Sequence, residues 1–79
     1  DIDYVAHIGN YQFGIQIKPV TANANYGGYS LSERMKNSFN DFTEKYGGKV
    51  FIVYSLKGEI ANAEVIDKIA EEIQRLKGL

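Results

Sequence analysis

The sequence contains no cysteine and no tryptophan, and it has only one proline, one methionine and one histidine. Without cysteine there is neither a disulfide framework nor a thiolate metal site, which favours an intracellular, cytoplasmic protein. No apolar run approaches the ~20 residues that a membrane-spanning helix needs, and no signal-peptide pattern is visible. We therefore expect a globular segment with no membrane association.

The chain also lacks an excess of charge of either sign. Nine basic and ten acidic residues leave a formal net charge of −1, whereas a self-contained nucleic-acid-binding domain usually has a basic excess. Hydrophobic residues are 44% and charged residues 24% of the 79, which indicates one globular domain, residues 1–79, with a modest core. Because the chain begins with Asp1 rather than methionine, we interpret it as a fragment of a longer protein.

A two-residue hairpin turn is predicted at the Gly9-Asn10 pair, because glycine supplies the positive φ of a type II′ turn. Paired residue numbers then sum to 19, so Asp3 faces Gln16 with Cβ atoms roughly 4.5–5.5 Å apart. Lys18 lies two residues further and projects from the same face. A slip of one residue would mix polar and apolar faces, and a bulge at Gly14 is the main risk to this register. The predicted apolar face carries Ile2, Tyr4, Ala6, Ile8, Tyr11, Phe13, Ile15 and Ile17.

The order of elements predicts an α/β (α+β) fold, a small mixed β-sheet with the order β-β-α-β-α. The hairpin strands cover residues 2–8 and 11–18, and Pro19 ends the second strand because it has no N–H to donate. Ser30 and Glu33 form a capping box that starts a helix, and Gly47-Gly48 ends it. The apolar positions of this helix are Leu31, Met35, Phe39, Phe42 and Tyr46.

The remaining elements are a buried strand and a final helix. The apolar run at 50–54 predicts a strand covered on both faces and parallel to the second hairpin strand. Asn62 is expected to cap a helix over 63–77, whose charged residues, among them Glu72 and Arg75, indicate an ordinary solvated surface. The predicted buried stripe of this helix is Val65, Ile66, Ile69, Ile73 and Leu76.

Asp3 and Gln16-Ile17-Lys18 lie on a hairpin that precedes a helix and a strand, and they resemble the active-site signature of the PD-(D/E)XK nuclease superfamily. The stretch from Ile17 to Thr21 is also similar to type II restriction endonucleases of the MjaI type. The resemblance implies a restriction-endonuclease-like core without its N-terminal helix and first strand, hence the C-terminal catalytic fragment of a longer nuclease. It further implies double-stranded DNA as partner, Mg²⁺ (with Mn²⁺ as substitute) as cofactor, a homodimer at full length, and little activity in the isolated fragment.

The resemblance also assigns a role to each residue of the motif. Asp3 would ligate the metal, Gln16 would offer its amide oxygen from the second acidic position, and Ile17 would add its carbonyl. Lys18 would position the attacking water or offset charge on the phosphate, where preorganised positive charge is effective. Gln16 departs from the family pattern because it is neutral, so the site has one carboxylate fewer.

Two functions from different classes stay open. One is a Mg²⁺-dependent endonuclease that hydrolyses DNA phosphodiester bonds, favoured by the convergence of Asp3, Gln16 and Lys18. The other is a non-catalytic nucleic-acid or protein-binding α/β module, favoured by the neutral Gln16 and the acidic charge balance. His7 shares the face of Asp3 but lies four residues away, roughly 13 Å along a strand, and is interpreted as a surface histidine.

Overall fold

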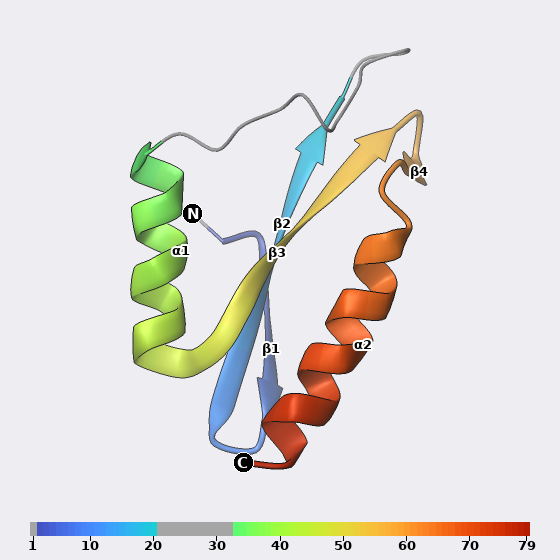
Figure 1. The fold of residues 1–79 in the computed structure, drawn as a ribbon. Helices are drawn as coiled ribbons and strands as arrows, with labels where there is room; N and C mark the ends of the chain where they lie inside the picture. The colour runs from blue at the N-terminus through green and yellow to red at the C-terminus, as the bar shows by residue number, and fades with distance from the viewer. Residues whose placement is uncertain (1, 21–32) are drawn as a thin grey trace.

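The computed structural model describes residues 2–20 and 33–79. They form a small mixed α+β fold in the order β1 (Tyr4–Ile8), β2 (Tyr11–Pro19), α1 (Glu33–Tyr46), β3 (Gly47–Leu56), β4 (Glu59–Ile60) and α2 (Glu64–Lys77). The strands are arranged as β1-β2-β3-β4, and the two helices lie on opposite faces of the sheet (Figure 1). The predicted class and β-β-α-β-α order are confirmed, with the two-residue β4 as an addition. Neither described helix is both long and apolar enough to cross a membrane.

The hairpin has the predicted register. Residue numbers paired between β1 and β2 sum to 19 along the whole ladder, starting with Ile8 opposite Tyr11. Gly9 has a φ of +60° and Asn10 does not have a positive φ, the combination that a type II′ turn requires. The β1–β2 ladder continues without a bulge at Gly14. The alternation of polar and apolar residues was therefore sufficient to define this pairing.

The hydrophobic core lies between α2 and the sheet. Phe13 and Phe51 of the two central strands pack edge to face, with ring centroids 6.1 Å apart, and they join Val65 and Leu76 of α2. Two members of the predicted apolar face do not reach this core, since Tyr4 is 61% and Ile17 39% exposed. The partly buried residues around the core are Ala6, Ile8, Tyr11, Ile15, Val53, Ile69 and Ile73.

Ile2 lies on the face opposite to the predicted one. The strand β1 begins at Tyr4, because the chain bends at Asp3. Ile2 therefore turns toward α1: it lines a cavity with Phe42, and a Cβ added to Gly14 would lie 2.8 Å from its Cγ2. The prediction that Ile2 continues the apolar face of the hairpin is wrong, and the strand starts two residues later than expected.

The helix α1 leads directly into β3. It ends at Tyr46, and Gly47 has a φ of +87°, a backbone conformation that glycine adopts readily, so the predicted stop is confirmed. Its predicted start at Ser30, with Leu31, lies outside the described residues. The strand β3 covers Gly47–Leu56 rather than residues 50–54, and it pairs with β2 in parallel as predicted.

Asn62 does not cap α2. Its Oδ1 accepts a hydrogen bond from the backbone N–H of Tyr54 at 2.8 Å, and its Nδ2 donates to the carbonyl of Ile52 at 2.9 Å. No side chain caps the helix, whose N-cap position is Ala63. Because β4 has only two residues, the edge of β3 extends beyond it, and a side-chain amide offers the donor and acceptor that a neighbouring strand would provide. The predicted capping role is therefore wrong.

The buried stripe of α2 differs from the prediction at two positions. Ile66 is 53% exposed, whereas Glu72 is only 3% exposed. Glu72 lies seven residues after Val65, so helical periodicity places both on the same core-facing side. The prediction was wrong for Ile66, and Glu72 does not belong to an ordinary solvated surface.

Candidate functional site

Asp3 and Gln16 meet at the end of the hairpin that is remote from the turn. The backbone N–H of Asp3 donates to Oε1 of Gln16 at 3.3 Å, and Oδ2 of Asp3 accepts from the backbone N–H of Ile17 at 2.7 Å. Continued antiparallel pairing would have joined Ile17 to the carbonyl of Ile2. The Asp3 carboxylate replaces that carbonyl, which explains why the regular strand stops where the site begins.

Two side-chain oxygens and one backbone carbonyl of these residues are candidate ligands. Oδ1 of Asp3, an exposed residue, forms no hydrogen bond with any part of the chain in ranges 2–20 and 33–79. Oε1 of Gln16 accepts one hydrogen bond and keeps a second lone pair. The carbonyl of Ile17 points to the same side of β2 as its N–H, toward β1. The two hydrogen bonds thus bring Asp3, Gln16 and Ile17 into contact, and their role as metal ligands stays a prediction.

The helix α1 closes the site on one side. Asp3 and Gln16 line a cavity of about 370 Å³ with four residues from the first half of α1. Among these, Met35 and Phe39 were expected on the apolar face of the helix, and they form the apolar wall. The four residues are Arg34, Met35, Ser38 and Phe39.

Arg34 lines the cavity although it lies outside the predicted motif. The sequence favours a solvated helix face for Arg34 over a contact with phosphate. In the structure Arg34 is exposed, and it also lines the cavity with Asp3 and Gln16. The signal was its spacing, since Arg34 and Ser38 are four residues apart and therefore lie on the same side of a helix. The cavity combines one carboxylate, one amide and one guanidinium.

Lys18 lies near but outside this cavity. Strand alternation puts it on the face of Gln16, where it is half-buried opposite Tyr54 of β3. It does not line the cavity, and its ammonium group has no ion pair within the described part of the chain. His7 is exposed and also lies outside the cavity. The structure joins Asp3, Gln16 and Ile17, and it leaves Lys18 beside them.

The donor atoms are of the kind that Mg²⁺ prefers. No group of three His, Cys, Asp or Glu side chains capable of holding a metal occurs among the residues that the structure describes. The predicted set has instead a single carboxylate, an amide oxygen and a carbonyl. These are hard oxygen ligands, and Mg²⁺ commonly completes its octahedral shell with water around one or two carboxylates. The residues present therefore fit the ion by donor chemistry.

Comparison with family models, with curated proteins and with solved structures found no match to this chain. The geometry around Asp3 is thus the basis for any assignment of function.

Proposed function

We propose that this chain is the catalytic part of a Mg²⁺-dependent endonuclease that hydrolyses phosphodiester bonds of double-stranded DNA, as a type II restriction endonuclease does. The observation that supports the proposal is the pairing of Asp3 with Gln16 in a cavity that also contains Arg34. A carboxylate beside oxygen donors attracts a divalent cation, and a guanidinium attracts a phosphate. A cytoplasmic homodimer belongs to the same proposal.

The chain's own residues hold and orient the ligand atoms. Asp3 Oδ1, Gln16 Oε1 and the Ile17 carbonyl would hold the ion, which supplies an acidified water and neutralises phosphate charge when bound. The Ile17 N–H fixes the Asp3 carboxylate, and the Asp3 N–H directs Oε1 of Gln16 toward the same place. Such outer hydrogen bonds usually decide how well a ligand side chain is oriented.

Two positively charged side chains would bind the phosphate in this proposal. Arg34 faces the strands from α1 and offers the planar donor set that suits two phosphate oxygens. Lys18, at the end of β2, adds positive charge at the strand end beside the cavity. Because Arg34 belongs to α1 and Lys18 to β2, the scissile phosphate would be held between the helix and the sheet.

A second candidate is a non-catalytic nucleic-acid or protein-binding module. It is favoured by the hydrogen bonds themselves, because Oδ2 of Asp3 and Oε1 of Gln16 already satisfy backbone N–H groups at the hairpin end. In that case the side chains of Asp3 and Gln16 hold β1 and β2 together at the end of the hairpin. The neutral Gln16 is then no loss, since an amide oxygen can accept the hydrogen bond from the Asp3 N–H without carrying a charge.

Calorimetric titration of Mn²⁺ and Mg²⁺ separates the two candidates. We expect the wild type to bind one ion, and Asp3→Asn to weaken binding by about tenfold or more, the usual scale for disturbing a metal site. Asp67→Asn, at an exposed position of α2, is the matched control and should bind the ion as the wild type does. Equal affinities of the wild type and Asp3→Asn would instead support the binding module.

A further inference from the structure

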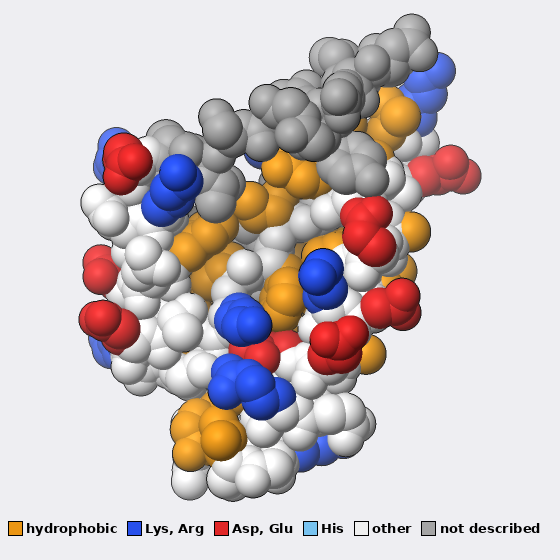
Figure 2. All heavy atoms as spheres, in the orientation of Figure 1, with side chains coloured by type: hydrophobic (Ala, Val, Ile, Leu, Met, Phe, Trp, Pro, Cys, Tyr) orange, Lys and Arg blue, Asp and Glu red, His pale blue; other side chains and the backbone are white. Residues whose placement is uncertain are grey.

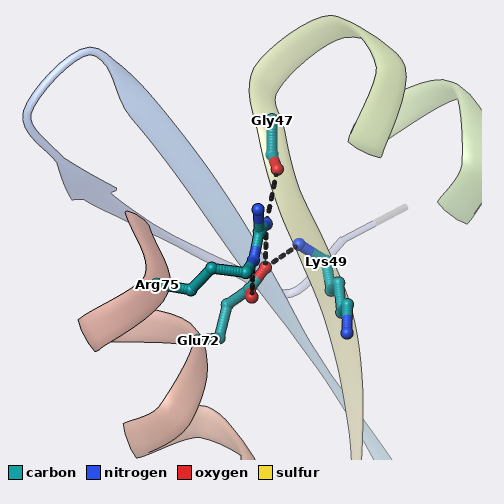
Figure 3. Close-up of polar contacts among 4 residues, drawn as sticks. All are labelled: Gly47, Lys49, Glu72 and Arg75. Carbon is teal, nitrogen blue, oxygen red and sulfur yellow. Dashed lines mark hydrogen bonds and ion pairs between the residues drawn. The ribbon is translucent and has the colours of Figure 1, made fainter. Parts of the chain in front are cut away.

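A second polar cluster joins α2 to the start of β3 on the other face of the sheet. Oε1 of Glu72 accepts from Nε of Arg75 at 2.7 Å, and Oε2 accepts from Nη2 of Arg75 at 3.0 Å (Figure 3). The backbone N–H of Lys49 also donates to Oε2, at 2.7 Å. Nη2 of Arg75 reaches further and donates to the carbonyl of Gly47 at 2.9 Å. These bonds occupy the backbone edge of β3 where β4 does not cover it.

Glu72 accepts three hydrogen bonds through these contacts. The hydrogen bonds from Arg75, and then that from Lys49, hold the pKa of Glu72 below its usual value despite burial. Both carboxylate oxygens are occupied, and Arg75 is the cation that neutralises them. The charge of Lys49 also contributes to lowering the pKa of Glu72, although its ammonium group forms no ion pair with that carboxylate.

Two lysine side chains line a cavity of about 430 Å³ beside the cluster. Lys49 enters from β3 and Lys68 from α2, and Phe51 contributes an apolar surface. On this side of the molecule, Lys and Arg side chains lie between the two helices next to hydrophobic atoms, with acidic side chains among them (Figure 2). Within ranges 2–20 and 33–79, neither lysine has an ion pair. The residues that line the cavity are Lys49, Phe51, Lys68, Glu71, Glu72 and Arg75.

This arrangement attracts an anion. Two ammonium groups from different elements line one cavity with the Arg75 guanidinium, and a bound anion would be attracted to all three. Nη1 of Arg75 donates to no described residue, so the guanidinium has donors left besides those used for Glu72. The cavity volume is within the range of small-molecule sites. Glu71 at the same cavity opposes the anion and limits its affinity.

We propose that the cavity between β3 and α2 binds a phosphate-bearing small molecule through Lys49, Lys68 and Arg75. It lies on the sheet face opposite to Asp3 and shares no residue with that site. The site is therefore independent of the endonuclease proposal. Phosphate is the favoured anion because its several oxygens can serve two ammonium groups and a guanidinium at once.

The test is a ¹⁵N-NMR titration of the 79-residue chain with inorganic phosphate and, separately, with adenosine monophosphate at low ionic strength. We expect saturable shifts of the backbone amides of Lys49, Phe51, Lys68 and Glu71. Similar affinities for the two probes mean that the phosphate group alone is recognised. Tighter binding of the nucleotide, with the largest shift at Phe51, means that the apolar surface also takes part.

Single variants then assign the binding groups. Lys49→Gln and Lys68→Gln should each weaken binding about fivefold, equivalent to ~1 kcal/mol, whereas Glu71→Gln should tighten it by removing the opposing charge. Lys57→Gln, at an exposed position in the turn between β3 and β4, is the charge-matched control. The proposal is overturned if no saturable shift occurs, if Lys49→Gln and Lys68→Gln bind as well as Lys57→Gln does, or if Arg34→Gln alone removes binding.

Discussion

The carboxylate of Asp3 accepts a hydrogen bond from the backbone N–H of Ile17 at 2.7 Å, the group that Ile2 would have paired in a regular hairpin. The same side chain therefore closes the end of the sheet and presents its second oxygen outward. A role in holding the hairpin and a role in binding a cation are compatible, because they use different oxygens. Substitutions that remove one role and preserve the other can separate them.

Asp3→Ala should destabilise the fold by about 1 kcal/mol, because it leaves the Ile17 N–H without its acceptor in an exposed position. Asp3→Asn should cost less, since its amide oxygen can still accept that hydrogen bond, although the charge needed for a cation is lost. Urea denaturation of both variants measures the difference. If both variants are as stable as the wild type, the hydrogen bond contributes nothing to the fold.

Gln16→Glu should tighten Mg²⁺ and Mn²⁺ binding, because it puts a second carboxylate beside Asp3 and hard cations gain from added negative charge. Without metal the variant should lose roughly 0.5 kcal/mol of stability, since like charges facing each other across strands repel. Thermal unfolding with and without Mg²⁺, together with calorimetry, measures both effects. An unchanged or weaker affinity would show that Gln16 is not a ligand.

Lys18→Ala in the intact protein should reduce DNA cleavage by about 10²–10³-fold, the scale for loss of one preorganised charge at a transition state. Folding and DNA binding should change little, because the ammonium group forms no ion pair within the described ranges. Plasmid digestion and a DNA-binding assay measure the two properties, with Lys57→Ala as control. Full cleavage by Lys18→Ala would remove Lys18 from the proposed mechanism.

The contacts of Glu72 predict a pH dependence of stability. Hydrogen bonds from Arg75 lower the pKa of Glu72 from its ordinary value of 4.5, so its contribution is complete above that value and is lost as the pH falls through the lower, folded-state pKa. Glu72→Gln should cost about 1–2 kcal/mol at pH 7, because the added amide N–H₂ faces the donors of Arg75. Urea denaturation from pH 7 to 3 should show a steeper loss of stability for the wild type than for Glu72→Gln. Parallel profiles would mean that Glu72 does not couple protonation to folding.

Asn62→Ala should destabilise the fold by about 2 kcal/mol, because it leaves the Tyr54 N–H and the Ile52 carbonyl unpaired next to a buried position. Asn62→Asp should be worse near neutral pH, since a carboxylate cannot donate to the carbonyl and faces it with a negative charge. The loss of stability in Asn62→Asp should become smaller at acidic pH, as the carboxyl group becomes protonated. Asn40→Ala, on the exposed side of α1, is the control, and equal stabilities of the Asn62 and Asn40 variants would contradict the role of the amide.

The sequence by itself determined the hairpin register, the β-β-α-β-α order and the proximity of Asp3 to Gln16. These depend on local rules: a turn pair at Gly9-Asn10 and strict alternation leave one coherent pairing, and a one-residue slip would exchange the two faces. The end of α1 at Gly47 is local in the same way, since only a residue tolerant of positive φ suits that position.

Only the tertiary structure decided where polar side chains replace backbone partners. Glu72 is buried, and Asn62 pairs with β3 instead of capping α2, because β3 has more edge than the short β4 can cover. Arg34 and Asp3 line the same cavity because α1 packs against β2 and β3. Each of these contacts joins residues distant along the chain, and periodicity within one element carries no information about which neighbouring element leaves a donor or acceptor unpaired.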